Sequence, residues 1–94
     1  MKKGYVYIMM NKNRTVIYIG VTSDLKQRVA QHREGKGSAF TAKYNCHYLV
    51  YYEIIPDMMQ AIEREKKLKR WHREWKLNLI KSLNEGLKDL SEDI

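Results

Sequence analysis

Three short runs of apolar and aromatic residues have the composition that favours β-strands. The first two runs are residues 5–10 and 16–21, and the polar segment "NKNR" between them has the chemistry of a turn. The third run is "YLVYYEII", which starts at Tyr48 and ends at Pro56, a residue that cannot donate to a strand ladder. We therefore predict a β-hairpin and a third strand.

Helical signals follow the hairpin and the third strand. Thr22 or Ser23 can cap a helix that runs through Glu34, and Gly35 and Gly37 provide the stop. A loop is expected from there to about His47.

The second helical signal starts directly after Pro56. Asp57 with Gln60 three residues later resembles a capping box and opens a helical pattern that reaches about Ser82. Because this pattern exceeds 25 residues, a break is expected near Trp71. The order β-β-α-loop-β-α predicts an α+β fold, with three strands flanked by helices, in a single domain over residues 1–94.

The hairpin separates its side chains into an aliphatic face and a phenolic face. Tyr7 and Tyr18 fall on one face because side chains alternate along a strand, and aligning the aliphatic residues of the other face places these two tyrosines opposite each other. This register leaves residues 11–14 as the loop. Gly20 shares the phenolic face, and a glycine within a strand indicates that another group approaches the backbone closely there.

The first helix carries polar groups on its inward stripe. Leu25, Arg28, Val29 and His32 recur at helical spacing, so Arg28 and His32 lie one turn apart on the side that faces the sheet. An arginine whose head reaches solvent and a hydrogen-bonded histidine would explain them structurally. A functional surface shared with Tyr7 and Tyr18 is the other interpretation.

The last helix places a carboxylate on its apolar stripe. Glu65 lies near the middle of a stripe that includes Leu68 and Trp75, and His72 shares this stripe as an expected packed histidine. A carboxylate in such a position needs a compensating cation. Arg28 could supply it as a buried ion pair, and a divalent metal such as Mg²⁺ is the alternative.

The charge balance favours a polyanionic partner. The chain has 18 Lys and Arg against 11 Asp and Glu, a formal net charge of +7, which favours nucleic acid over an anionic membrane. The basic residues around Glu65 form either a solvated face or a track for phosphates. No signal peptide or membrane span is evident, so we expect a cytoplasmic protein. The single cysteine, Cys46, next to His47, lacks further ligands for a metal site.

The order of these motifs resembles the GIY-YIG nuclease family, especially its short stand-alone bacterial members. The resemblance spans about residues 4–80 and is carried by "YVY" at the first strand, "YIG" at the second, "DLKQRVAQH" and "ERE". It implies a three-stranded antiparallel sheet flanked by helices. It also implies a DNA endonuclease that uses one divalent ion, Mg²⁺ or Mn²⁺, with DNA repair or recombination as its setting.

The resemblance also implies roles for individual residues. Glu65 would bind the metal and Tyr7 would act as general base or orient the water. Arg28 would stabilise charge on the phosphate, while Tyr18 and His32 would position the phosphate or the nucleophile. The residues expected to contact nucleic acid are Lys26, Lys43, Lys66, Lys69 and Arg70.

The chain departs from the family pattern at three places. Tyr5 replaces the namesake glycine, "GKGSAFTAKY" contains no second histidine, and Asn84 is not clearly in register with the late asparagine of the family. No appended DNA-reading domain is evident, so specificity would come from a protein partner, from dimerisation, or be absent. A nucleic-acid-binding module with little catalytic activity is the main alternative function, and a membrane-surface protein is a weaker one.

Overall fold

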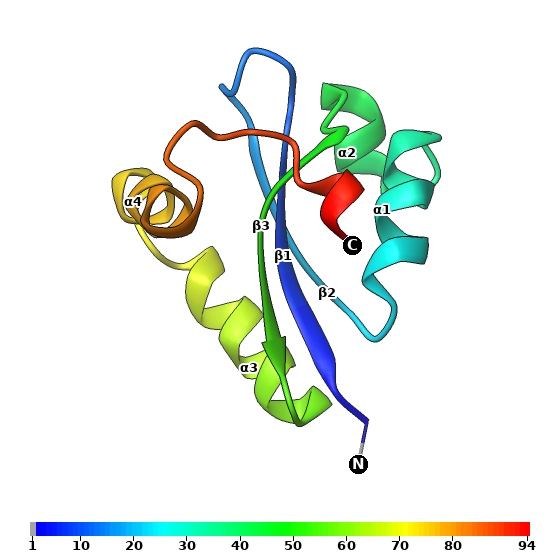
Figure 1. The fold of residues 1–94 in the computed structure, drawn as a ribbon, viewed down its shortest axis with the longest axis vertical. Helices are drawn as coiled ribbons and strands as arrows, with labels where there is room; N and C mark the ends of the chain where they lie inside the picture. Colours follow the sequence, from blue (N-terminus) through cyan, green and yellow to red (C-terminus); the bar gives the residue numbers. More distant parts are fainter. Residues whose placement is uncertain (1) are drawn as a thin grey trace.

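A three-stranded antiparallel sheet lies between two layers of helices, as predicted (Figure 1). The computed structural model describes residues 2–94, and the strand order is β2-β1-β3, so β2 and β3 are the two edges. The strands are β1 (Gly4–Met10), β2 (Ile17–Thr22) and β3 (Tyr48–Ile55). The helices are α1 (Leu25–Arg33), α2 (Ala39–Tyr44), α3 (Met58–Lys69), α4 (Arg73–Leu83) and a 3₁₀ turn at Ser91–Asp93.

Each face of the sheet has its own hydrophobic core. The even-numbered residues of β1, including Val6 and Ile8, are fully buried against α3 and α4, where they contact Leu68. The odd-numbered Tyr7 is buried on the opposite face with Val29 of α1. Alternation of side chains along β1 therefore places one core on each face of the sheet, under the two layers of helices that Figure 1 shows.

The predicted hairpin register was wrong by two residues. Tyr7 pairs with Gly20 and Tyr18 pairs with Met9, so the connecting loop has six residues, 11–16, rather than four. The Asn11 side chain holds this longer loop because its Oδ1 accepts backbone N–H groups of the fourth and fifth residues after it. A slip of two residues leaves every side chain on its predicted face.

The first two helices begin at caps that sequence analysis did not identify. The α1 cap is Asp24, whose carboxylate accepts the N–H of Gln27, rather than Thr22 or Ser23. Helix α2 lies within the segment expected to be a loop, and Ser38 caps it. At six residues, α2 is too short to show a helical pattern in the sequence.

The long C-terminal helical pattern breaks where it was expected to break. Helix α3 starts after Asp57, which accepts the N–H of Met59, and α4 starts after His72. Trp71 in the break is partly buried and packs against the core. The break changes the direction of later side chains, so the placement of Trp75 and His72 on a packed stripe was wrong: both are exposed, with Trp75 54% exposed.

Asn84 forms hydrogen bonds to the backbone at β3, the edge of the sheet opposite β2. Val50 is the extra residue of a β-bulge, because its neighbours Leu49 and Tyr51 pair with consecutive residues of β1. The Asn84 amide donates to the Val50 carbonyl at 2.9 Å and to the Lys88 carbonyl at 2.8 Å. This side chain therefore ties the end of α4 to the irregular edge strand.

None of the helices described between residues 2 and 94 has the length and apolar character needed to cross a bilayer.

Candidate active site at the edge of strand β2

The phenol ring of Tyr7 lies directly over Gly20. A Cβ atom at Gly20 would lie 2.5 Å from both Cζ and the hydroxyl oxygen of Tyr7, which is closer than real contacts allow. The position of Gly20 within a strand predicted that another group approaches its backbone closely, and that group is the ring of Tyr7. Tyr18 flanks the same ring, with the two ring centroids 6.3 Å apart. The missing side chain lets a residue of the central strand reach across β2.

His32 holds the Tyr7 hydroxyl through a buried hydrogen bond. The Tyr7 oxygen lies 2.7 Å from His32 Nε2, and His32 Nδ1 lies 2.8 Å from Thr41 Oγ1. We assign the tautomer in which His32 Nδ1–H donates to Thr41 Oγ1, because the Thr41 hydroxyl hydrogen can point to the Ser38 carbonyl 3.2 Å away. In this tautomer His32 Nε2 carries a lone pair, and the Tyr7 hydroxyl donates to it.

Both members of this pair are neutral at pH 7. Burial, then the neighbouring Tyr18, raises the pKa of Tyr7 above its usual 10.0, and the Arg28 charge opposes this shift. Burial, together with the Arg28 charge, lowers the pKa of His32 to about 4. Glu65 also raises the pKa of Tyr7, so the charges of Arg28 and Glu65 both act on this phenol.

Glu65 comes from the opposite helical layer. Its side chain is only 13% exposed, and its carboxylate pairs with Lys69 one turn later at 3.0 Å. One of the two explanations expected for this carboxylate was an ion pair between Glu65 and Arg28. The structure instead pairs Glu65 with Lys69. A half-exposed lysine is a replaceable partner for this carboxylate.

A hollow of about 270 Å³ runs along the outer edge of β2 and joins the two helical layers. We call it the β2 hollow. Residues of β2 form its floor, Phe40 of α2 lies on one side and two lysines of α3 and α4 lie on the other. Its lining residues are Ile17, Tyr18, Ile19, Phe40, Lys69 and Lys76.

The protein offers a divalent ion one carboxylate rather than a cage. Between residues 2 and 94, no group of three or more His, Cys, Asp or Glu side chains could hold a metal. Glu65 supplies a hard oxygen ligand and pairs with Lys69, which lines the β2 hollow. This donor set fits Mg²⁺, which commonly binds to one or two carboxylates and completes its shell with water and phosphate oxygens.

The basic residues expected to contact nucleic acid are divided among several surfaces. Lys69 lines the β2 hollow, and Lys43 lies on α2 with its Nζ 5.3 Å from the centre of the Tyr44 ring. Lys66 and Arg70 are exposed at the end of α3. Lys69 and Lys43 therefore extend the candidate site on both of its sides.

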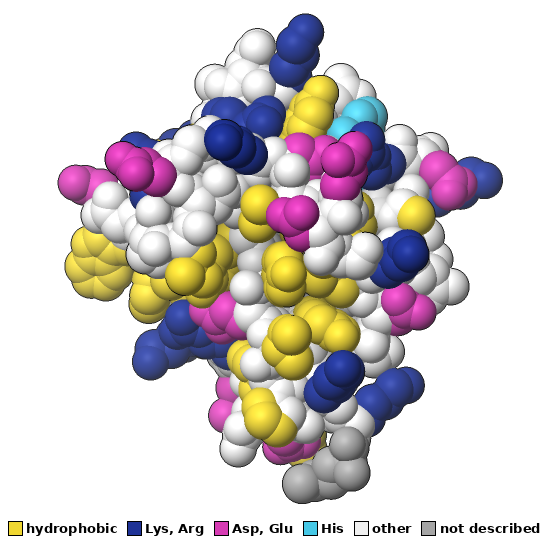
Figure 2. Space-filling model, viewed as in Figure 1, with side chains coloured by type: hydrophobic (Ala, Val, Ile, Leu, Met, Phe, Trp, Pro, Cys, Tyr) yellow, Lys and Arg dark blue, Asp and Glu magenta, His cyan; other side chains and the backbone are white. Residues whose placement is uncertain are grey.

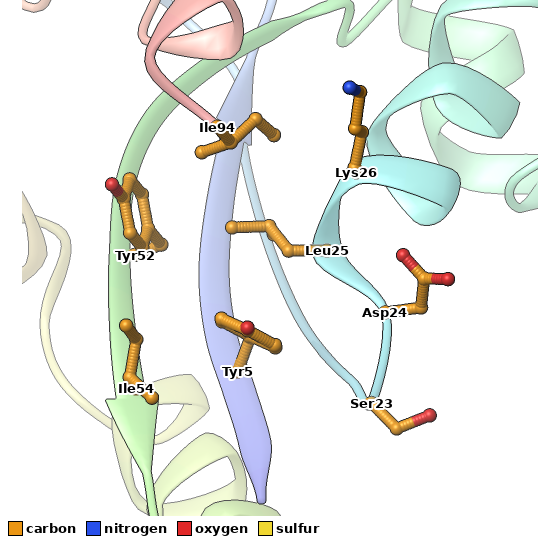
Figure 3. Close-up of a pocket in the computed structure, with 8 residues that line it drawn as sticks. All are labelled: Tyr5, Ser23, Asp24, Leu25, Lys26, Tyr52, Ile54 and Ile94. Atoms are coloured by element: carbon orange, nitrogen blue, oxygen red, sulfur yellow. The ribbon is translucent and has the colours of Figure 1, made fainter.

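Lys26 lies in a different hollow, of about 290 Å³, shown in Figure 3. This hollow is formed by the start of α1, the C-terminal Ile94 and the outer parts of β1 and β3, and its lining is mostly apolar. It contains none of the five candidate catalytic residues, and its carboxylate, Asp24, caps α1. In Figure 2, hydrophobic side chains gather over the β3 side of the molecule, with both basic and acidic groups around them.

Sequence reasoning missed three residues around this site. Thr41 fixes the hydrogen bonding of His32, Phe40 packs on Tyr18, and Lys76 lines the β2 hollow. The spacing of Ser38 and Thr41 fits a helix cap, which was the one available signal for α2. Nothing in the sequence indicated that this short helix reaches the hairpin.

Comparisons with known proteins identify a family that matches most of the chain. Residues 3–78 match the family described as GIY-YIG catalytic domain. The UPF0213 protein SH2523 of Staphylococcus haemolyticus is 36% identical over 80 residues, which cover 85% of this chain and 96% of that protein. A UPF0213 protein of Syntrophus aciditrophicus is 34% identical over 82 residues, which cover 86% and 93% of the two chains.

A solved structure is similar over nearly the whole chain. The solution NMR structure of the UPF0213 protein BH0048 from Bacillus halodurans has a TM-score of 0.59 and 27% sequence identity. The similarity covers 96% of this chain and 95% of that one.

Replacing Gly20 by Ala should disrupt the site. The new methyl group collides with the Tyr7 ring, so we expect the protein to lose about 1–3 kcal/mol of stability in urea unfolding. Gly86→Ala is the control, because the nearest atom outside its chain neighbours lies 3.5 Å away, on a flexible lysine side chain. If Gly20→Ala and the wild type are equally stable, the Tyr7 ring does not depend on the absence of a side chain at this position.

Protonation of His32 should destabilise the fold in mild acid. The pKa of His32 is about 4 in the folded protein and 6.5 in the unfolded chain. As the pH falls, the unfolded chain therefore binds the proton at a higher pH than the folded protein does. Stability should therefore fall as the pH drops from about 6.5 to about 4, by on the order of 3 kcal/mol. Urea unfolding across this range measures the loss. His32→Gln should lack this part of the pH dependence, and an unchanged slope in that variant would contradict the assignment.

Proposed function

Because the chain belongs to the GIY-YIG catalytic-domain family, a family of nucleases, we propose that it is a divalent-metal-dependent endonuclease that hydrolyses phosphodiester bonds in DNA. The supporting observation is the buried hydrogen bond between Tyr7 and His32, beside the charges of Arg28 and Glu65. In this proposal the chain acts as one nuclease domain, with DNA repair or recombination as its setting.

Tyr7 and His32 provide a path for the proton of the attacking water. The Tyr7 hydroxyl donates to His32 Nε2, so its oxygen lone pairs are available to accept a proton from water. As water attacks phosphorus, its proton passes to the Tyr7 oxygen and the Tyr7 proton passes to His32 Nε2. The phosphorus–oxygen bond to the leaving strand breaks in the same displacement, and the leaving oxygen takes up a proton from solvent. The phenol stays neutral throughout, which agrees with its raised pKa.

The low pKa of His32 restricts this path to the substrate-bound state. In the free protein, burial and the Arg28 charge keep the imidazole a weak base. An incoming phosphate anion offsets the Arg28 charge and favours the imidazolium form of His32. Thr41 continues to accept the Nδ1–H, so the ring keeps its orientation during the transfer.

Two charged side chains of the protein act on the reacting phosphate. Arg28, whose charge acts on both Tyr7 and His32, provides a guanidinium for the charge that develops on the phosphate oxygens. Glu65 would hold Mg²⁺ or Mn²⁺, and Lys69, its present partner, would be released towards the DNA backbone. When bound, the ion supplies positive charge to the phosphate and to the leaving oxygen. Tyr18, beside Tyr7 at the β2 hollow, would orient the phosphate.

The β3 side of the molecule remains available to a protein partner that supplies specificity. It lies across the sheet from β2, and its exposed apolar groups include Ile54, 60% exposed, and Leu83, 74% exposed. A partner bound there would leave the β2 hollow free for DNA.

Glu65→Gln should abolish metal-dependent cleavage while leaving the fold intact. The glutamine removes the charge that binds the ion, and its half-exposed lysine partner contributes little to stability, so unfolding should change by less than about 1 kcal/mol. Cleavage of nicked, branched and single-stranded DNA is measured with Mg²⁺, Mn²⁺ or EDTA. Glu63→Gln is the matched control, because Glu63 is exposed two residues away on α3.

The outcomes separate the enzyme from a binding module. Metal-dependent cutting that survives in Glu63→Gln but not in Glu65→Gln supports the enzyme. Salt-sensitive DNA binding without cutting, equal in both variants and the wild type, would instead support a catalytically inactive nucleic-acid-binding module.

A further inference from the structure

A row of aromatic rings leads outward from the candidate site along α2. The Phe40 ring stacks on Tyr18, with centroids 5.9 Å apart and planes inclined by 30°. The Tyr44 ring continues the row, with its centroid 4.8 Å from that of Phe40. The row thus connects a candidate catalytic residue to the surface of a helix that sequence analysis did not predict.

The outer rings of this row are not core residues. Phe40 is 42% exposed and Tyr44 is 41% exposed, and the buried residue of α2 is Thr41. Thr41 hydrogen-bonds to His32, so α2 is oriented by the catalytic network rather than by its aromatic side chains. Single exposed apolar residues are ordinary, whereas adjacent exposed rings beside a candidate site suggest a binding surface.

Lysine side chains surround the row. Lys69 and Lys76 share the β2 hollow with Tyr18 and Phe40, and Lys43 lies over the Tyr44 ring. Aromatic faces next to a cationic groove form the combination that binds single-stranded nucleic acid, where bases stack on the rings and lysines follow the phosphates. A fully paired duplex presents base edges rather than free base faces, so it cannot use these rings in this way.

We propose that Phe40 and Tyr44 form a stacking platform for unpaired bases next to the scissile phosphate. The preferred substrate class is therefore DNA with an unpaired strand at the cut, such as a flap or a single-strand branch, rather than a continuous duplex. This inference rests on the proposed function, because it places the scissile phosphate beside Tyr18 and Tyr7.

Direct binding measurements test the platform without depending on cleavage. Fluorescence anisotropy in EDTA compares Glu65→Gln with Glu65→Gln carrying Phe40→Leu on a single strand, a flapped duplex and a paired duplex. Leucine keeps an apolar side chain but removes the aromatic face. We expect affinity for the single strand and the flap to fall about 10-fold, with less than about a twofold change for the paired duplex.

Matched variants separate stacking from general surface effects. Phe40→Tyr keeps the ring and should bind as Phe40 does. Met59→Ala removes an exposed apolar side chain at the start of α3 and should have no effect. Tyr44→Leu tests the outer ring independently, even if Phe40→Leu fails a thermal unfolding check. Equal losses on all three DNAs, or no loss in either leucine variant, would overturn the platform.

The proposed function can fail separately. If the wild-type protein cuts DNA with the predicted metal dependence while the leucine variants bind unpaired DNA normally, the platform is wrong and the nuclease remains. If the wild-type protein neither binds nor cuts any of these DNAs, both proposals are wrong.

Discussion

The packing of the Tyr7 ring over the bare backbone of Gly20 is the constraint on which the rest of the site depends. Tyr7 belongs to the central strand, where alternation fixes it on the face covered by α1. Without a side chain at Gly20, the phenol crosses β2 and meets His32, which Thr41 orients from α2. A single backbone position thus determines whether residues of a strand and two helices can share one hydrogen-bond network.

The two helical layers supply complementary chemistry to the β2 edge. The α1 and α2 layer provides the buried neutral network and the aromatic rings, while the α3 and α4 layer provides Glu65 and two lysines of the hollow. Because the sheet separates the two helical layers, the neutral and buried Tyr7–His32 pair can lie near an exposed basic surface. This arrangement suits proton transfer next to an anionic substrate, because burial keeps the Tyr7–His32 pair neutral while the lysines remain accessible.

Much of this arrangement could be predicted from sequence because it follows from local periodicity. Alternation assigned Tyr7, Tyr18 and Gly20 to one face, and helical spacing predicted that Arg28 and His32 lie close together on α1, where the Arg28 charge acts on His32. The hairpin register could not be predicted, because a two-residue slip preserves both faces and only the bonds of Asn11 select the longer loop. Helix α2 was missed because its orientation comes from a tertiary contact of Thr41 rather than from an apolar stripe.

Single-turnover cleavage by Tyr7→Phe is the most direct test of the claim that the Tyr7 hydroxyl transfers the proton of the attacking water. The substitution keeps the ring over Gly20 and removes only the hydroxyl. At saturating Mg²⁺ and DNA, we predict a loss of about 10²–10⁴-fold in rate, with DNA affinity unchanged. Tyr52→Phe, at the residue paired with Tyr7 on β3, should retain the wild-type rate. A Tyr7→Phe protein that cuts at the wild-type rate would contradict the account.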